Sequence, residues 1–503
     1  MDTLSALADG FGALLAPTAL IALLAGVVIG SVVGVLPGIG PVGAMALLLP
    51  LSFAFDPAVG LLMTIAIYLG SQYGGSTSSI LLSVPGEASS VVTTLDGHQM
   101  TKRGRAGAAL AVSAIGSFVA GTMAVALLML LSEPLSAFAI RFSAPEYLAL
   151  CIFAILVLSR LSGGTFTRSM LAVGLGLMLA TIGLDDLSGN VRFTFDIGEL
   201  IQGVEITPVA VGLFGIAEVL LLAENRGHVP QLPKVPFRSL WPTRTEMRRA
   251  VPPMFRGGLL GFFFGLVPGP SAAVSTYASY MLERRISKHR DEFGKGAIEG
   301  VSGPESANNG AAGGAMVPLI VLGFPFNGVT ALLLAGFTIH GIIPGPLFVE
   351  NSPDLFWSLV AGMYAANITL LILNFPLVGL FTSLLRIPRD VLLGLIVLIA
   401  IIGTYAARSA LIDVFWLFAM GVLGYVMVKL RLSRVALMLA FVIGPILESS
   451  LTQTVAFANG DPTVLLQRPI TMTIVVLTAL VVLTPVIFRG LKRDRAVDSA
   501  DAV

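Results

Sequence analysis

The chain has 503 residues, of which 55% are hydrophobic and only 12% charged, with a mean hydropathy of +0.91 and a formal net charge of +1. Soluble proteins carry about 25% charged residues, and a soluble chain of this size could not cover its surface with so few. The composition excludes a soluble enzyme, a nucleic-acid-binding protein and a disordered scaffold. It predicts an all-α integral membrane protein that lies in a lipid bilayer.

The N-terminal segment carries Asp2 and Asp9 but no basic residue before its first apolar run. Because a secretory signal peptide begins with a basic region, we expect this run to be retained as a span. Long uncharged intervals follow, among them 10–55, 106–132 and 306–349. A spanning helix needs about 20 apolar residues, so the longer intervals must hold more than one helix. We predict about a dozen membrane-embedded helices, some of them short or broken.

Basic loops alternate with acidic or neutral loops along the chain. The basic loops are 102–105, 226–256, 284–295, 386–389, 429–434 and 489–495. The acidic or neutral loops are the N-terminus, 133–146, 185–205, 350–354 and 448–461. The positive-inside rule then predicts a multi-pass protein of a bacterial inner membrane with a periplasmic N-terminus and a cytoplasmic C-terminus.

The first part of the chain contains two Gly-rich or Pro-rich breaks. Residues 35–41 read VLPGIGP, and residues 74–79 read GGSTSS before an apolar stretch that ends at Pro85. Backbone groups of such a polar stretch need partners that lipid does not supply. We therefore predict that 74–79 is the unwound tip of a re-entrant hairpin, with the helix starting at Ile80 aiming its N–H groups at a water-filled cavity. The alternative is close helix packing by small residues.

The second part of the chain repeats these features. Residues 266–271 read LVPGPS, and residues 306–314 read SANNGAAGG before a stretch that ends at Pro325. Pro268 lies 231 residues after Pro37, and Pro325 lies 240 residues after Pro85. Nearly equal offsets indicate an internal duplication.

Loop charges predict that the two copies are inverted, because the first follows an outside terminus and the second follows a basic, inside loop. Inverted repeats with matching breaks point to a binding site at the membrane midplane. The predicted organisation is a first repeat at 1–225, a cytoplasmic basic linker at 226–256, a second repeat at 257–450, a final membrane segment at 451–488 and a cytoplasmic tail at 489–503.

The two predicted tips offer uncharged polar groups. Serine and threonine hydroxyls and asparagine amides can donate to an anion or accept toward a cation, and glycine allows close approach to the backbone. Neither tip contains lysine or arginine, so helix N-termini and co-bound cations would have to help hold an anion. The predicted substrate-binding residues are Gly38, Gly75, Ser76, Thr77, Ser78, Pro268, Gly269, Ser271, Asn308 and Asn309, with a coupling Na⁺ near Gly38, Ser76 and Asn308.

Other ionisable groups are few. Glu87 and Glu305 lie beside the tips and are candidates for a functional role or for a water-exposed rim. His98 and His340 occupy related places, where helix-end hydrogen bonding is favoured over a proton relay. Cys151 sits in an apolar run and is predicted to be a small buried hydrophobe. The sequence has no Walker loop and no metal-ligand cluster, so it predicts no cofactor beyond a coupling Na⁺ or H⁺.

Three segments resemble a known family. Residues 70–100 (GSQYGGSTSSILLSVPGEASSVVTTLDGHQM), 267–280 (VPGPSAAVSTYASY) and 299–346 (EGVSGPESANNGAAGGAMVPLIVLGFPFNGVTALLLAGFTIHGIIPGP) are similar to the motifs of the large permease subunit of tripartite tricarboxylate transporters. The resemblance implies a small four-span membrane subunit and a periplasmic solute-binding protein as partners. It also implies secondary transport of citrate-like organic acids, with no enzymatic activity.

The sequence therefore favours a cation-coupled importer of di- and tricarboxylates that works by an elevator-type displacement of the part holding both tips. The alternative is an anion-selective channel that uses the same polar residues as a filter. A membrane-embedded enzyme and a purely structural subunit are disfavoured, the first by the lack of a catalytic cluster and the second by the paired polar tips.

Overall fold

The computed structural model describes residues 3–35, 39–161, 165–185, 188–224, 237–378, 389–458, 461, 463 and 467–483. Within these ranges, seven helices are long and apolar enough to cross a membrane: Pro17–Val35, Ala106–Ala139, Ala144–Leu161, Ile206–Glu224, Pro353–Asn374, Leu411–Lys429 and Arg434–Ala458. Shorter apolar helices accompany them, and the only strands described are two residues long each. The prediction of an all-α membrane protein is confirmed.

The chain divides into two compact units. Unit 1 comprises Met1–Ala139 and Val204–Lys429, and unit 2 comprises Ile140–Gly203 and Leu430–Val503. Unit 1 therefore contains the Pro- and Gly-rich breaks of both repeats, whereas unit 2 takes residues from both predicted repeats. The predicted tail at 489–503 lies outside the described residues.

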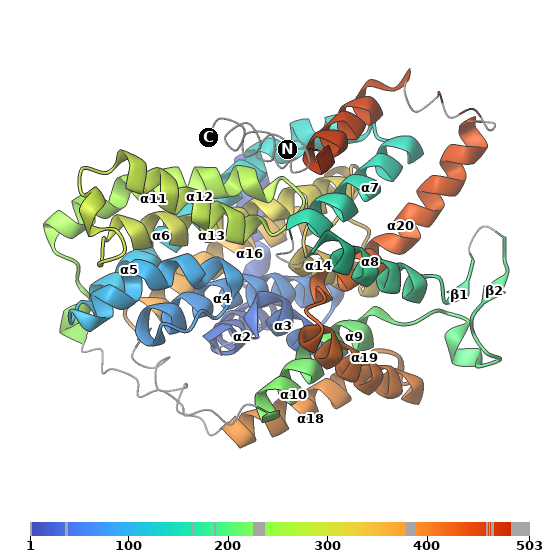
Figure 1. The fold of residues 1–503 in the computed structure, drawn as a ribbon, viewed down its shortest axis with the longest axis horizontal. Helices are drawn as coiled ribbons and strands as arrows, with labels where there is room; N and C mark the ends of the chain where they lie inside the picture. The colour runs from blue at the N-terminus through green and yellow to red at the C-terminus, as the bar shows by residue number, and fades with distance from the viewer. Residues whose placement is uncertain are drawn as a thin grey trace, which may run out of the picture. The chain divides into compact units, whose positions relative to one another are not determined.

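Unit 1 contains two runs of helices (Figure 1). The first run consists of α1 (Thr3–Leu14), α2 (Pro17–Val35), α3 (Gly40–Leu48), the 3₁₀ turn Leu49–Ala54, α4 (Pro57–Leu82), the 3₁₀ turn Ala88–Ser90, α5 (Val91–Lys102) and α6 (Ala106–Ala139). The second consists of α11 (Arg244–Gly265), α12 (Ser271–Ile286), the 3₁₀ turn Arg290–Glu292, α13 (Glu299–Leu322), α14 (Gly328–Ile339), α15 (Phe348–Asn351) and α16 (Pro353–Asn374). Helices α2, α3, α4, α5 and α6 correspond in order to α11, α12, α13, α14 and α16, whereas α1 and α15 have no counterpart among the described helices.

The remaining elements of unit 1 lie between and after these runs. They are α9 (Ile206–Ala210), a π-helical turn at Val211–Ile216, α10 (Ala217–Glu224), the 3₁₀ turn Phe237–Leu240, α18 (Arg389–Arg408) and α19 (Leu411–Lys429). Helix α11 begins at Arg244, inside the predicted linker 226–256, because Thr243 caps it. Thr243 Oγ1 accepts a hydrogen bond from the backbone N–H of Glu246 at 3.2 Å.

The two repeats agree down to backbone dihedral angles at their second break. Helix α4 is followed by Ser83 with φ 58° and ψ 23°, and α13 by Gly323 with φ 65° and ψ 26°. Four residues later, Glu87 (φ −149°, ψ 171°) and Asn327 (φ −149°, ψ 174°) each open the next helical segment. A left-handed residue ends a helix, and the prolines at 85 and 325 prevent it from continuing. Each pair is 240 residues apart, which is the offset predicted from the prolines.

Helices α4 and α13 run in opposite directions where they cross. Tyr68 donates its hydroxyl to the carbonyl oxygen of Ala312 at 3.4 Å, and farther along α4 the hydroxyl of Ser76 donates to Glu305, farther back on α13. The packing is reciprocal, since α6 lies against α13 and α16 against α4, while α5 contacts α13 and α14 contacts α4. Helices α4 and α13 are thus antiparallel, as the predicted inversion of the repeats requires.

The predicted unwound tips are wrong. Residues 74–79 lie inside the continuous helix α4, and 306–314 lie inside α13. The breaks fall instead at the prolines on either side. Glycines in these stretches allow neighbouring helices to approach: a Cβ on Gly74 would lie 2.5 Å from the carbonyl oxygen of Ser31 on α2, and one on Gly310 would collide with the backbone of Gly258 on α11. Close packing by small residues is the physical reason.

Unit 2 contains α7 (Ala144–Leu161), α8 (Phe166–Ala180), the antiparallel strands β1 (Gly183–Leu184) and β2 (Val191–Arg192), the 3₁₀ turn Gly198–Leu200 and α20 (Arg434–Ala458). An apolar helix at Pro469–Leu483 follows. Helix α20 packs against α7 and α8. Arg468 pairs with the buried Glu146 at 2.8 Å, and Arg192 pairs with Glu448 at 2.5 Å. Cys151 is fully buried in α7, as predicted.

Candidate functional site

A polar cluster lies where the two repeats cross in unit 1. We call it the crossing cluster and define it as Gln72 and Ser76 of α4, Glu87 of the first repeat's second break, Thr93 of α5, Ser113 and Ser117 of α6, and Glu305, Asn308 and Asn309 of α13. Its hydrogen bonds join residues about two hundred positions apart in the sequence, so it exists only because the repeats meet.

Glu305 is the most deeply buried acid of this cluster, with 1% of its surface exposed. Its carboxylate accepts hydrogen bonds from the hydroxyls of Ser76 and Thr93, and from Ser113 Oγ at 3.0 Å. A carboxylate is costly to bury unless donors replace its water shell. Three hydroxyls from α4, α5 and α6 do so here, and Glu305 thereby ties the second repeat to three helices of the first.

Glu87 is only partly buried, and two amide side chains lie against its carboxylate. Asn308 Nδ2 donates to Glu87 Oε1 at 3.0 Å. With its amide nitrogen turned toward Glu87, Gln72 donates to the two carboxylate oxygens at 2.9 and 3.2 Å. The carbonyl oxygen of the Asn308 amide is buried and has no hydrogen-bond partner among the described residues. An acceptor oxygen thus remains available beside a carboxylate.

Asn309 serves the packing of the cluster. Its Nδ2 donates to Ser117 Oγ at 2.7 Å and to the backbone carbonyl of Glu305 at 3.2 Å. Because Ser117 lies one turn after Ser113 on α6, the same helix face supports both Asn309 and Glu305. The side chains of Asn308 and Asn309 therefore point to different partners, one toward Glu87 and the other toward α6.

The crossing cluster contains two acids and no basic residue. In the part of the chain that the structure describes, neither Glu87 nor Glu305 is paired with a lysine or arginine. Two carboxylates without a basic partner attract a cation or a proton and repel an anion. The cluster itself is therefore suited to a cation, and an anionic substrate needs other groups or a bound cation beside it. The described residues contain no group of three or more His, Cys, Asp or Glu side chains that could hold a metal ion.

The two breaks of each repeat touch one another. In the second repeat, the backbone N–H of Gly269 donates to the carbonyl oxygen of Phe326 at 2.9 Å, and Gly269 has φ 130°. In the first repeat, a Cβ on Gly40 would lie 3.6 Å from Cβ of Glu87. Helices α3 and α12 therefore begin beside the second break of their own repeat, and their N-terminal N–H groups are suited to carboxylate groups.

The structure brings part of the predicted site together. Ser76, Asn308 and Asn309 belong to the crossing cluster, and Gly75 faces Glu87, since a Cβ there would lie 3.4 Å from Cγ of Glu87. Thr77 and Ser78 are buried on α4, with Ser78 Oγ donating to the carbonyl of Gly75 at 3.0 Å.

The other predicted residues have different neighbours. Pro268 and Gly269 are buried at the break before α12, which Ser271 begins, and Gly269 contacts Phe326 rather than the crossing cluster. Gly38 lies outside the described residues. His98 and His340 form helix-end contacts, with the carbonyl of Ile80 at 3.3 Å and with Ser52 Oγ at 3.2 Å.

Sequence reasoning missed Gln72, Thr93, Ser113 and Ser117. Each is a polar residue in an apolar or mixed helix, and Ser113 and Ser117 have the i, i+4 spacing of one helix face. That spacing inside an uncharged span was a signal that could have pointed to a buried partner.

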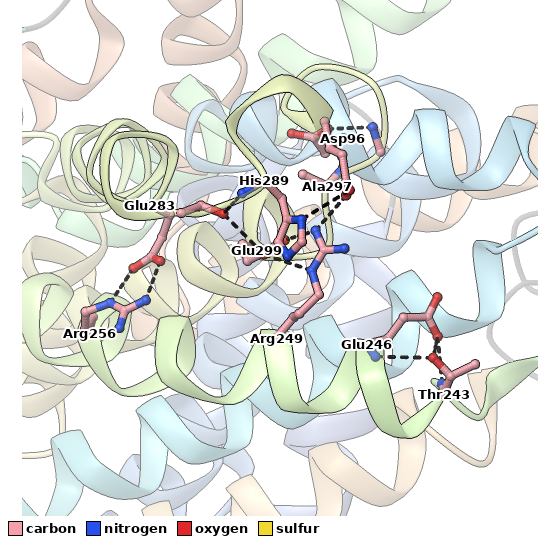
Figure 2. A network of polar contacts seen from close by, with 12 residues as sticks. Asp96, Thr243, Glu246, Arg249, Arg256, Glu283, His289, Ala297 and Glu299 are labelled. Atoms are coloured by element: carbon pink, nitrogen blue, oxygen red, sulfur yellow. Dashed lines mark hydrogen bonds and ion pairs between the residues drawn. The ribbon is translucent and has the colours of Figure 1, made fainter.

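An ionic network holds the helices of the second repeat together at the beginning of α13 (Figure 2). Arg249 of α11 pairs with Glu292 at 2.6 Å and with Glu299 at 2.8 Å, and Arg256 pairs with Glu283 at 2.6 Å. The network fixes α11, α12 and α13 relative to one another.

Two contacts join the first repeat to this network. Asp96 of α5 accepts hydrogen bonds from the backbone N–H groups of Gly296 and Ala297 at 2.7 and 2.8 Å, and Arg105 pairs with Glu246. Burial raises the pKa of the Glu246 carboxyl, but hydrogen bonds from Thr243 and Arg105 outweigh it and hold that pKa below its usual value. The Glu246 carboxylate is therefore an anionic anchor between the repeats at neutral pH.

Helical repeats that cross at a buried polar cluster, together with seven helices long enough to span a membrane, define a multi-pass membrane protein whose arrangement is found in transporters. The model of the tripartite tricarboxylate transporter TctA family matches residues 20–439. The chain belongs to this family of transporters, as its motifs indicated.

Two relatives come from Agrobacterium vitis. The "Uncharacterized 52.8 kDa protein in TAR-I ttuC' 3'region" is 42% identical over 471 residues, which cover 93% of each chain. The "Uncharacterized protein in TAR-II ttuC' 3'region" is 42% identical over 210 residues, covering 42% of this chain and 87% of that protein. No solved structure matches the chain.

Proposed function

We propose that this protein is the large membrane subunit of a cation-coupled importer of organic di- and tricarboxylates. The observation that carries the proposal is the crossing cluster: two antiparallel repeats enclose Glu305 and partly bury Glu87, and neither acid has a basic partner among the described residues. Membership of the tricarboxylate transporter family supplies the class of substrate. Bare transfer of such an anion through lipid is prohibitive, and cations bound beside it reduce the charge that moves.

The substrate and the cation have separate places in this proposal. The carboxylate groups of the substrate are held at the helix starts that follow Gly38 and Gly269, by N-terminal N–H groups together with Ser271. The residues from Gly75 to Ser78, with Asn308 and Asn309, stand on the cation side and contact the substrate through their helix faces. The proposal needs no unwound tip, because both polar stretches are helical.

The wider system follows from the family. We propose a small four-span membrane subunit and a periplasmic solute-binding protein as partners, in a bacterial inner membrane with the N-terminus periplasmic and the C-terminus cytoplasmic. Unit 1 carries the breaks of both repeats, so an elevator-type displacement would move the substrate, the cation and all four breaks together.

The test is uptake into proteoliposomes that contain both membrane subunits, with the binding protein and a radioactive carboxylate such as citrate outside. We expect accumulation only when a Na⁺ or proton gradient is imposed, with saturation at high substrate concentration. Flux that needs no ion gradient and does not saturate would contradict the proposal and favour the channel. The neighbouring reading frames offer a quick check, because a four-span protein and a secreted binding protein should be encoded beside this chain.

A further inference from the structure

We propose that Glu87, Asn308 and Gln72 form a binding site for one Na⁺ ion, and that this ion is the coupling cation. The inference rests on the proposed function and identifies the residues that bind its cation. The site lies between the first repeat's second break, α4 and α13, and it is separate from the hydroxyl cage of Glu305.

The side-chain amide of Asn308 is buried beside Glu87, and within the described part of the chain its oxygen has no partner. Its side chain is 1% exposed, its Nδ2 is bonded to Glu87, and its Oδ1 has no partner among the described residues. Because both amide atoms are attached to one carbon, Oδ1 lies next to the carboxylate that Nδ2 contacts. Buried polar atoms are nearly always satisfied, so an orphan oxygen beside a carboxylate points to a missing positively charged partner.

The side-chain amide of Gln72 also lies beside the Glu87 carboxylate. Turned one way, it donates to both oxygens of Glu87 at 2.9 and 3.2 Å. Turned the other way, it places its carbonyl oxygen at the same position beside the carboxylate. A cation on Glu87 would favour the second orientation, in which Gln72 Oε1, Asn308 Oδ1 and the Glu87 carboxylate all supply oxygen atoms while Asn308 Nδ2 stays bonded to Glu87. Oxygen ligands are those that hard cations such as Na⁺ prefer.

Glu87 and Glu305 differ in how accessible their carboxylates are to an ion. Glu305 is enclosed and its oxygens already accept from three hydroxyls. Glu87 is partly exposed, and a Cβ on Gly75 would lie 3.4 Å from its Cγ, so no side chain separates Gly75 from it. The partial exposure of Glu87 offers an ion a contact that the enclosed Glu305 lacks. One accessible carboxylate with two neutral amide oxygens suits a monovalent ion better than a divalent one.

The second repeat supplies the internal comparison. Asn327 occupies the same backbone conformation as Glu87, and its Oδ1 accepts from the N–H groups of Val329 and Thr330 at 3.0 and 2.9 Å. The residue equivalent to Asn308 at an offset of 240 is Tyr68. The second repeat therefore has the cap but neither the carboxylate nor the orphan amide oxygen, and it has no such site.

This comparison provides the variant. Glu87→Asn installs the residue that caps the equivalent break, so the fold is retained while the carboxylate is removed. Asn327→Asp is the matched control, because it keeps a capping oxygen at the other break. Asn308→Ala removes the orphan oxygen and serves as a second, independent variant.

The experiment measures the thermal unfolding of the complex of both membrane subunits in nanodiscs as NaCl replaces choline chloride at constant ionic strength. We expect Na⁺ to raise the Tm of the wild type and of Asn327→Asp, while KCl has little effect. In Glu87→Asn the half-saturating Na⁺ concentration should rise by about tenfold or more, with a smaller rise in Asn308→Ala.

A Na⁺ response that survives in Glu87→Asn would overturn the proposal, and so would equal stabilisation of the wild type by K⁺ or by acidification alone. Uptake measured on the same preparation separates this result from the proposed function. Sodium-driven uptake with an unchanged Na⁺ response in Glu87→Asn would refute the site alone. Loss of the Na⁺ response in Glu87→Asn, with wild-type uptake that needs no gradient, would refute the coupling alone.

Discussion

The second breaks of the two repeats share a backbone and differ in chemistry. Ser83 and Gly323 end their helices with the same left-handed geometry, and Glu87 and Asn327 open the next segments with the same extended one. Both residues form a capping box with the residue three positions on, but only the Glu87 carboxylate also contacts Asn308 in the other repeat. The helix break is thus alike in the two copies, and only the first copy has a carboxylate there.

The largest effect is expected at Glu305, which the second repeat contributes and the first repeat surrounds. Glu305→Ala leaves the hydroxyls of Ser76, Thr93 and Ser113 without their acceptor, and we expect a loss of about 3 kcal/mol in unfolding free energy. Thermal unfolding in nanodiscs measures it. Glu133→Ala, at an exposed position of α6, is the control and should change stability by less than about 0.5 kcal/mol. Equal effects of the two variants would show that the cage is not structural.

Exchanging Glu87 and Asn327 between the two breaks tests whether the carboxylate at position 87 is needed for uptake. Glu87→Asn should lower the initial rate of carboxylate uptake by about 100-fold, equivalent to about 2.7 kcal/mol, with an unchanged elution profile. Adding Asn327→Glu should not restore uptake, because Tyr68 stands where Asn308 would be needed. Recovery in the double variant would mean that the two breaks are interchangeable.

The close packing of α2 against α4 can be tested at Gly74. Gly74→Ala places a Cβ 2.5 Å from the carbonyl oxygen of Ser31 and should force α2 and α4 apart, at a cost of about 2 kcal/mol. Gly12→Ala meets no atom within 4 Å and should be neutral or slightly stabilising. Unfolding temperatures of the two variants give the comparison. A tolerated Gly74→Ala would argue that this stretch is loose, as the unwound-tip prediction required.

The smallest effect concerns the helix ends themselves. Ser83→Gly should relieve left-handed strain and stabilise the protein by about 1 kcal/mol, while Gly323→Ala should destabilise it, because it forces a Cβ into a left-handed conformation and to 2.4 Å from the carbonyl oxygen of Pro344. Opposite signs in the two unfolding temperatures would support the equivalence of the breaks. The same sign in both would contradict it.

Much of the fold was predictable because it depends on local signals. Prolines that end helices, uncharged intervals of membrane length and repeated motifs at a constant offset are all visible in the sequence. The unwound tips were wrong because a run such as 74–79 has the composition of a loop and also that of a tightly packed helix. Tertiary packing decides between them, and it overrides the weak helix propensity of glycine and serine.

The candidate site was predictable only in part. Ser76, Asn308, Glu87 and Glu305 stood out as polar groups near breaks in an apolar chain. Their partners Thr93 and Ser113 did not, since each lies about two hundred residues from Glu305 in the sequence. Which carboxylate is caged and which is open depends on such long-range contacts, and neither composition nor spacing reveals it.

The most direct test of the account is to measure radioactive sodium and radioactive citrate uptake in the same proteoliposomes that contain the complete system. If uptake is coupled to sodium through Glu87, the two ions enter the vesicles in a fixed ratio, and Glu87→Asn abolishes both together. Citrate that accumulates in the wild type without sodium entry would contradict it.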